Sequence, residues 1–224
     1  MKILSVNVGQ PRTITHNGQE TTTGIFKSPV AGPIPIRGHN LDGDGQADLD
    51  SHGGPNKAVY AYPHEHYAHW AQTIRRTDLS FGQFGENLTV TGLLEDQIHI
   101  GDTYRFGTAL LQVAQPRMPC FKLGLRMEMK KFPQIFMHSG RTGFYWRVVE
   151  EGQIQAGDPI KPVQTNASQF TVRRIWEMGF VEPGEPEEMR RALTLTSLGR
   201  EWRQPLARHL LALGLGDQEK SPPS

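Results

Sequence analysis

The stretch Leu110-Leu111-Gln112-Val113-Ala114-Gln115 has the residue pattern of a β-strand. Leu111 and Val113 are two positions apart, so an extended chain places both side chains on one face, where they can pack together. Further along, Phe144-Tyr145-Trp146-Arg147-Val148-Val149 is dominated by aromatic and β-branched residues, which strands favour. The two segments therefore predict two strands of a sheet.

Short segments of this kind recur through the first three-quarters of the chain. We expect strands at residues 3–8, 24–27, 58–62, 87–90, 103–106, 109–114, 143–149 and 153–160. Most of the 24 glycines and 16 prolines fall before residue 165, which indicates frequent turns. Two helices are expected among the strands, at residues 64–75 and, broken at Pro133, at residues 127–137. Many short strands with turns between them predict a barrel or a sandwich.

The pattern changes near Pro162, beyond which we expect helices. One ends at Trp176, with Asn166 or Ser168 as its cap, and the others span residues 185–193 and 197–213. The last carries an apolar stripe formed by Trp202, Leu206, His209 and Leu210. The prediction is a mainly β fold with helices (α+β): a barrel domain at residues 1–163, a three-helix domain at 164–214 and a disordered tail at 215–224.

Composition excludes several classes of partner. The 224 residues suit one large domain or one domain with a small appendage. A formal net charge of +1 gives no sign of nucleic-acid or membrane binding through bulk electrostatics. No apolar run approaches the ~20 residues that cross a bilayer, and the N-terminus lacks a signal-peptide cleavage pattern. We expect a cytoplasmic protein, with a homodimer possible through the helical stripe.

The only cysteine, Cys120, lies in Pro116-Arg117-Met118-Pro119-Cys120-Phe121-Lys122. A single cysteine can form neither an intrachain disulfide nor a multi-thiolate zinc site. It is therefore a buried spectator, a nucleophile, or one soft ligand of a metal. If Arg117 and Lys122 lie close to the sulfur, they stabilise the thiolate.

Other segments could contribute to a site for an anion. In Ile25-Phe26-Lys27-Ser28-Pro29-Val30, a lysine and a hydroxyl precede a proline-rich turn, although ordinary solvated turn residues explain the same pattern. In His52-Gly53-Gly54-Pro55-Asn56-Lys57, two glycines let backbone amides approach a ligand and Lys57 adds charge. In Phe84-Gly85-Glu86-Asn87-Leu88, a turn brings Glu86 and Asn87 to the start of a strand, or is simply a β-turn. A further candidate is His138-Ser139-Gly140-Arg141-Thr142-Gly143.

Metal sites built from protein side chains alone are not indicated. The acidic segment beginning at Asp42 has Gly53 where a calcium loop needs a bidentate glutamate. His66 and His69 share one helical face but lack a third zinc ligand at suitable spacing. The main alternative is a cysteine nucleophile paired with His52, His64 or His138.

Taken in order, four segments resemble the MOSC domain family, the module found at the C-terminus of molybdenum-cofactor sulfurases, and more closely its stand-alone YiiM subfamily. The segments are Gly24-Ile25-Phe26-Lys27-Ser28-Pro29-Val30; Gly43-Asp44-Gly45-Gln46-Ala47-Asp48 with His52-Gly53-Gly54 and Lys57-Ala58-Val59-Tyr60; Phe84-Gly85-Glu86-Asn87-Leu88; and Pro116-Arg117-Met118-Pro119-Cys120-Phe121-Lys122. The resemblance spans nearly the whole chain. Each segment alone is weak, and the ordered set is specific.

The resemblance implies a barrel-like fold that binds a molybdenum cofactor (molybdopterin), with Cys120 as the metal ligand. It implies an oxidoreductase that reduces N-hydroxylated base analogues such as 6-hydroxylaminopurine, with a role in detoxification and hydroxylaminopurine resistance. Electrons would come from a separate reductase, because the chain has no flavin, haem or iron–sulfur motif. The resemblance also brings an expectation of pyridoxal phosphate binding.

The residues expected to hold the cofactor are mainly cations and backbone amides. They are Lys27, Ser28, Arg37, Gly53, Gly54, Lys57, Asn87, Arg117, Lys122 and Arg141. His52 or His138 is expected to supply a proton to the leaving hydroxyl group. Two alternatives remain, a cofactor carrier without turnover and a metal-free cysteine hydrolase or sulfur-transfer protein.

Overall fold

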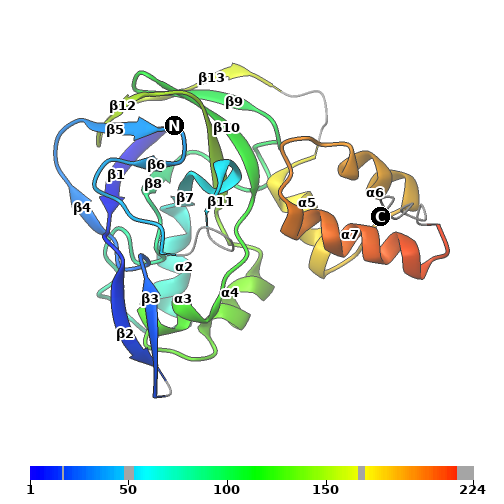
Figure 1. The fold of residues 1–224 in the computed structure, drawn as a ribbon, viewed down its shortest axis with the longest axis horizontal. Coiled ribbons are helices and arrows are strands. Elements are labelled where there is room, and N and C mark those ends of the chain that lie inside the picture. Colours follow the sequence, from blue (N-terminus) through cyan, green and yellow to red (C-terminus); the bar gives the residue numbers. More distant parts are fainter. Residues whose placement is uncertain (17, 48–52, 166–169, 216–224) are drawn as a thin grey trace, which may run out of the picture.

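The computed structural model describes residues 1–16, 18–47, 53–165 and 170–215. A strand-rich part carries three C-terminal helices at one side: α5 (Val172–Phe180), α6 (Pro186–Leu193) and α7 (Arg200–Ala212) (Figure 1). The predicted α+β fold with a small C-terminal helical domain is confirmed. Within the described residues, no helix is both long and apolar enough to cross a membrane.

The main sheet has eight strands in the order β13-β9-β10-β11-β7-β8-β1-β4. The strands are β1 (Lys2–Val8), β4 (Ser28–Val30), β7 (Val59–Pro63), β8 (Leu88–Thr91), β9 (Thr103–Phe106), β10 (Ala109–Pro116), β11 (Phe144–Glu150) and β13 (Ile160–Gln164). Among the described strands, only β7 and β8 pair in parallel, and helix α2 (Glu65–Thr73) lies between them in the chain. A bridge between Lys2 and Pro159, next to β13, joins this end of the sheet to β1. The sheet therefore curls back on itself and becomes barrel-like.

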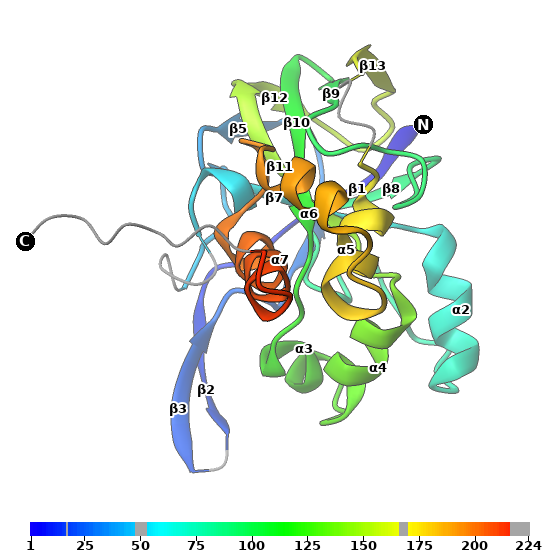
Figure 2. The ribbon, with the colours of Figure 1, turned by 90° about the vertical axis from the view of Figure 1, so that its right-hand side faces the viewer.

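Two smaller sheets complete the strand-rich part. One contains β12 (Gly152–Ile154), β5 (Ile34–Arg37) and β6 (Asn40–Leu41). The other is the hairpin of β2 (Arg12–His16) and β3 (Gln19–Thr23), which projects from the body of the molecule (Figure 2). The sequence does not predict this hairpin because its strands are polar and largely exposed, so they lack an apolar face.

Two predicted strands need correction. Residues 24–27 form no strand, and pairing with β1 begins only at Ser28. The segment predicted at 153–160 is divided between β12 and β13. Gly157 lies between them with φ of 93°, a left-handed conformation that favours glycine and turns the chain.

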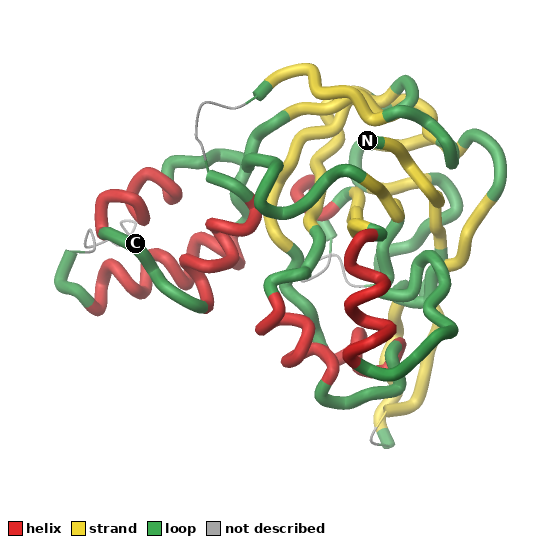
Figure 3. The backbone as a smooth tube through the Cα atoms, turned by 180° about the vertical axis from the view of Figure 1, so that it is seen from behind, coloured by secondary structure: helices red, strands yellow, loops and turns green. Residues whose placement is uncertain are grey.

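An aromatic cluster lies between α2 and the helices that follow Cys120. Those helices are α3 (Phe121–Arg126) and α4 (Phe132–Ser139), and Figure 3 shows the helices of the strand-rich part gathered at one end of it. The cluster is built on fully buried Tyr62, Trp70, Phe84, Phe132 and Phe136. The helix predicted at residues 127–137, with a break at Pro133, is found only from Phe132 onward, as α4. Pro133 lies in the first turn of α4, where its missing N–H is harmless.

The C-terminal helices are α5 (Val172–Phe180), α6 (Pro186–Leu193) and α7 (Arg200–Ala212). The side chain of Thr171 caps α5 by accepting a bond from the Arg174 amide, while Asn166 and Ser168 lie outside the described residues. Of the predicted stripe, Trp202, Leu206 and Leu210 are buried and His209 is only half-buried. Helix α5 packs against both α7 and strand β10, which joins the helical domain to the sheet.

Candidate active site

The candidate site is a pocket that encloses ≈ 620 Å³, including the open space at its mouth. Strands β3, β7 and β11, the 3-10 helix η1 (Pro55–Lys57) and the loops after β6 and β10 contribute its walls. Its lining residues are Thr23, Gly24, Ile25, Lys27, Asp44, Gly45, Gln46, Ala47, Lys57, Tyr60, Gly85, Asn87, Arg117, Cys120, Lys122 and Tyr145.

Cys120 lines this pocket at the point where the loop after β10 turns into α3. It occupies the position before the first helical residue, with an extended backbone (φ −121°, ψ 175°). Its side chain is half-buried, so it is not a buried spectator. The thiol interacts electrostatically with Arg117 and Tyr145.

Arg117 is a buried, permanent cation beside the sulfur. It is 6% exposed and donates hydrogen bonds to the Phe84 carbonyl (2.7 Å) and the Tyr60 hydroxyl (3.3 Å). Its guanidinium carbon lies 4.6 Å from the centre of the Tyr60 ring, within cation–π distance. Burial by itself lowers the pKa of Arg117, but Tyr60, Tyr145 and Cys120 raise it above its ordinary value. The pocket therefore keeps this positive charge at every accessible pH.

Lys27 is buried and forms an ion pair with Asp44 in the wall of the pocket. Burial lowers the pKa of Lys27, and Asp44 partly opposes that effect. Asp44 also accepts hydrogen bonds from the Gly9 amide (2.9 Å) and from Asn87 Nδ2 (2.8 Å). Lys27 is thus buried and held in place by its partners. The alternative interpretation from the sequence, an ordinary solvated turn residue, does not describe it.

Glycines let the chain segments around this ion pair approach closely. A Cβ atom on Gly24 would lie 2.3 Å from the Gly45 carbonyl oxygen, well inside contact distance. A Cβ on Gly85 would lie 2.6 Å from Ile25 Cγ1, and the residue has φ of +81°. Both positions line the pocket, so larger side chains there would displace its walls.

Replacing Asp44 with alanine should destabilise the fold strongly. The change leaves the Lys27 ammonium buried without its counter-charge, for which we expect a loss of roughly 3–5 kcal/mol. Urea unfolding measures the effect. The control is Asp42→Ala, which breaks the exposed pair with Arg37 and should shift stability by no more than about 0.5 kcal/mol. Equal effects of the two substitutions would contradict the role given to Asp44.

Two more lysines line the pocket. Lys57 ends η1, and its ammonium lies 2.7 Å from Glu201 Oε1 of helix α7. Lys122 lies in the first turn of α3, two residues after the cysteine. With Lys27 and Arg117, the pocket therefore gathers four cationic side chains around one thiol.

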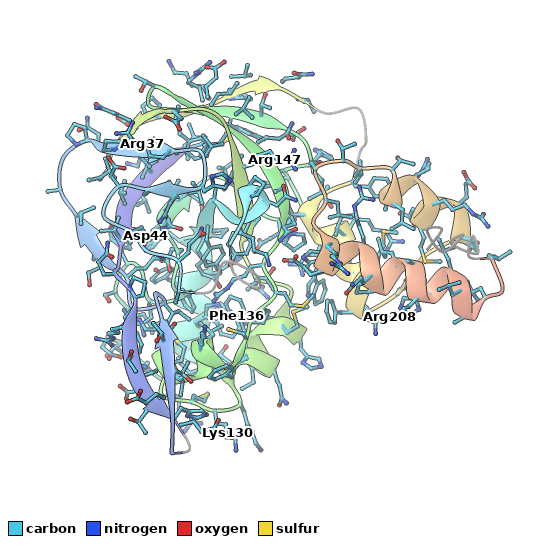
Figure 4. The ribbon with its side chains drawn as sticks, in the orientation of Figure 1. Arg37, Asp44, Lys130, Phe136, Arg147 and Arg208 are labelled. Atoms are coloured by element: carbon cyan, nitrogen blue, oxygen red, sulfur yellow. The ribbon has the colours of Figure 1, made fainter. Side chains whose placement is uncertain are left out.

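Several residues predicted for the site do not line it. Ser28 and His138 are exposed, and His138 Nδ1 lies 2.7 Å from the Gln134 carbonyl at the end of α4. Arg37 is exposed on β5, beside Asp42 and Glu151, and Figure 4 shows it above Asp44 near the edge of the strand-rich part. Gly53, Gly54 and Arg141 are also absent from the pocket lining, and His52 lies outside the described residues.

A histidine of α2 has a structural role. His66 is buried, and its Nε2 lies 2.8 Å from Glu95 Oε2. Within the ranges that the structure describes, no group of three or more His, Cys, Asp or Glu side chains could hold a metal ion.

Tyr60, Tyr145 and Glu201 are parts of the site that the sequence reasoning did not single out. Tyr60 and Tyr145 face each other across paired strands β7 and β11. Phe144 and Trp146, on either side of Tyr145 in the chain, are fully buried on one face of the strand. Since side chains of a strand alternate between its two faces, the sequence could have predicted that Tyr145 lies on the opposite face, toward the pocket. Glu201 carries no such local signal, because its contact with Lys57 spans the two domains.

Comparison of the sequence with models of known protein families identifies the strand-rich part. Residues 48–161 match the model of the MOSC domain. The chain belongs to the MOSC domain family. Residues 170–211 of this MOSC protein match the YiiM-like, 3-alpha helix domain, so it is of the YiiM type. The boundary predicted at residues 163 and 164 stays a prediction.

Known relatives of this MOSC protein support the same assignment. It is 39% identical to the uncharacterized Bacillus subtilis protein YflK over 90% of each chain, and 32% identical to Escherichia coli YiiM over 85% of each. A Gibberella moniliformis protein named "Reductase" is 34% identical over 70% of this chain, which spans 28% of that longer protein. The crystal structure of YiiM from Geobacillus stearothermophilus superposes with a TM-score of 0.79, at 34% identity, over 93% of this chain and 98% of that one.

Proposed function

We propose that this MOSC protein binds a molybdenum cofactor and reduces N-hydroxylated substrates, such as 6-hydroxylaminopurine, with electrons from a separate reductase. The observation that carries the proposal is the pocket in which Cys120 lies among Lys27, Lys57, Arg117 and Lys122. MOSC domains are generally associated with molybdenum-cofactor binding. A similar protein carries the name "Reductase", which supports the redox part of the proposal.

The pocket fits the chemistry of such a cofactor. A thiolate is a soft ligand that suits a sulfur-ligated metal. Because the described residues hold no three-residue metal cluster, a metal at Cys120 would take most of its ligands from the cofactor itself. The cationic side chains supply donors for the phosphate group of molybdopterin.

The residues of the pocket would then have distinct tasks. Cys120 would ligate the metal, while Arg117, Lys57 and Lys122 would face the anionic phosphate. Asp44 and Asn87 would hold Lys27 in place through the contacts described above. The bound cofactor would supply two-electron redox chemistry. Reduction of an N–OH group consumes two electrons and two protons, and releases the amine and water.

A hydrogen-bond donor to the leaving hydroxyl group is needed beside the sulfur, and His138 lies outside the pocket. Tyr145 lines the pocket, and burial raises the pKa of its phenol above the ordinary value. The phenol therefore keeps its proton at neutral pH and can donate a hydrogen bond to a bound hydroxyl group.

The proposal is tested with protein purified from a host that makes molybdenum cofactor. Metal analysis and mass spectrometry should find molybdenum and pterin bound to the chain, and would also detect pyridoxal phosphate. The loaded protein, given a reductase and NADPH, should convert 6-hydroxylaminopurine to adenine. Bound cofactor without turnover with any donor would indicate a carrier. No cofactor, from a host shown to load a control enzyme, together with rapid thiol alkylation, would favour a cysteine hydrolase or sulfur-transfer protein.

Replacing Lys122 with alanine should weaken retention of the cofactor. The substitution removes one half-buried cation from the pocket, and we expect roughly a three- to tenfold loss of bound pterin after washing in high salt. The control Lys130→Ala removes an exposed lysine that does not line the pocket and should leave retention unchanged. Equal retention by both variants would remove Lys122 from the binding set.

A further inference from the structure

Helix α7 of the C-terminal domain reaches the wall of the pocket through Glu201, in its first turn. Glu201 Oε1 lies 2.7 Å from the Lys57 ammonium, and Lys57 lines the pocket. The same oxygen accepts a hydrogen bond of 2.6 Å from Nε2 of Gln115. Glu201 also acts electrostatically on Tyr145, a further lining residue. One carboxylate of the helical domain is therefore connected to two residues of the site.

The start of α7 is held firmly at this position. Gln115 is fully buried in β10, and Trp202, next to Glu201, donates a hydrogen bond of 2.9 Å to the Pro116 carbonyl. A Cβ atom on Gly199, the residue before the helix, would lie 1.7 Å from Gln115 Oε1, so a larger residue there would force the Gln115 side chain to move. The carboxylate of Glu201 is thus fixed by the sheet that also carries the segment leading to Cys120.

A fixed carboxylate determines where the ammonium of Lys57 lies. A lysine side chain has four rotatable bonds, and holding it in one arrangement before a ligand arrives lowers the entropy lost on binding. An ammonium carries three donors, so its bond to one carboxylate does not by itself prevent it from binding an anionic ligand. Lys57 has 15% of its side chain exposed and can still be reached from the pocket.

We propose that Glu201 is a positioning residue: it holds Lys57 in the pocket wall for an anionic group, so that the helical domain completes the site. The identity of that anion as the cofactor phosphate rests on the proposed function. The positioning itself rests on the Lys57–Glu201–Gln115 contacts. The sequence suggested only a structural or dimer-forming role for this domain, and the proposal gives it a part in ligand binding.

The test uses inorganic pyrophosphate as the probe and cofactor-free full-length protein, studied by isothermal titration calorimetry. Glu201→Ala should weaken pyrophosphate binding roughly three- to tenfold, because the ammonium loses its fixed position. Glu201→Gln keeps an oxygen acceptor and should bind within about twofold of wild type. The double variant with Lys57→Ala should bind no more weakly than Lys57→Ala alone, since both changes act through one ammonium. The matched control is Glu177→Ala, which removes an α5 carboxylate from its pair with Arg174 outside the pocket and should change nothing.

Glu201→Asp keeps the charge but shortens the side chain, so it provides the same test if the alanine variant does not fold. It should weaken binding in the same direction as alanine. Wild-type affinity in both Glu201→Ala and Glu201→Asp would overturn the proposal. Tighter binding in both Glu201→Ala and Glu201→Gln would also overturn it, because Glu201 would then act only as a counter-charge. The proposal would also be overturned if the wild type showed no measurable binding of pyrophosphate.

Molybdenum and pterin contents of the same variants separate this inference from the proposed function. A loaded wild type with a several-fold lower occupancy in Glu201→Ala supports both. A loaded wild type with equal occupancy in all variants overturns the positioning role alone. A wild type that never carries the cofactor, yet binds pyrophosphate through Glu201 and Lys57, overturns the proposed function and supports the positioning role.

Discussion

Cys120→Ala should abolish molybdenum binding, lowering the metal content per chain by at least about tenfold relative to wild type. The reason is that the thiolate is the one protein ligand that the proposal assigns to the metal. Reduction of 6-hydroxylaminopurine should fall to background. Metal analysis of wild type and variant, purified side by side from the same host, measures the first effect, and a coupled reductase assay measures the second.

The loss should be specific to the sulfur. Met118→Ala changes an exposed apolar residue in the same loop and should retain the metal. Cys120→Ser keeps the size but offers a hard hydroxyl, so it should lose metal as alanine does. Unchanged thermal unfolding of the cysteine variants would show that the fold is intact. Full metal content and activity in Cys120→Ala would falsify the proposed role of this residue.

Trp202→Ala should destabilise the fold strongly. The side chain is fully buried, packs edge-on against Phe180 and donates a hydrogen bond to the Pro116 carbonyl. Removing it leaves a cavity and an unsatisfied carbonyl oxygen between the helical domain and β10, which we expect to cost about 3–5 kcal/mol of unfolding free energy. Urea denaturation monitored by circular dichroism measures the change.

The same helix provides a control for this substitution. Leu211 is 56% exposed, so Leu211→Ala should change stability by no more than about 0.5 kcal/mol. A loss below about 1 kcal/mol in Trp202→Ala would contradict the view that Trp202 anchors the two domains. Because Trp202 neighbours Glu201, the variant should also lower anion affinity in whatever fraction remains folded.

Much of the fold could be predicted because the signals are local. The strand predicted at Leu110–Gln115 appears as β10, where Leu111 and Val113 are both fully buried. The helix predicted after Pro63 appears as α2, with buried Tyr67 and Trp70 on one face. In contrast, the polar hairpin of β2 and β3 has no apolar periodicity, so only its pairing in three dimensions reveals it.

The candidate site shows the same division. The sequence by itself determined that Cys120 is a lone thiol with cations nearby in the chain, and it named Lys27, Lys57, Asn87, Arg117 and Lys122, all of which line the pocket. Only the tertiary structure decided that Ser28, Arg37, His138 and Arg141 are not among the lining residues, and that Asp44 and Glu201 hold two of the lysines. Spacing along a chain reports which residues share a strand or helix face. Gln115 and Glu201, however, are 86 residues apart and meet only because α7 packs against β10 beside the pocket. Such contacts depend on how whole elements pack together, which no local pattern of residues encodes.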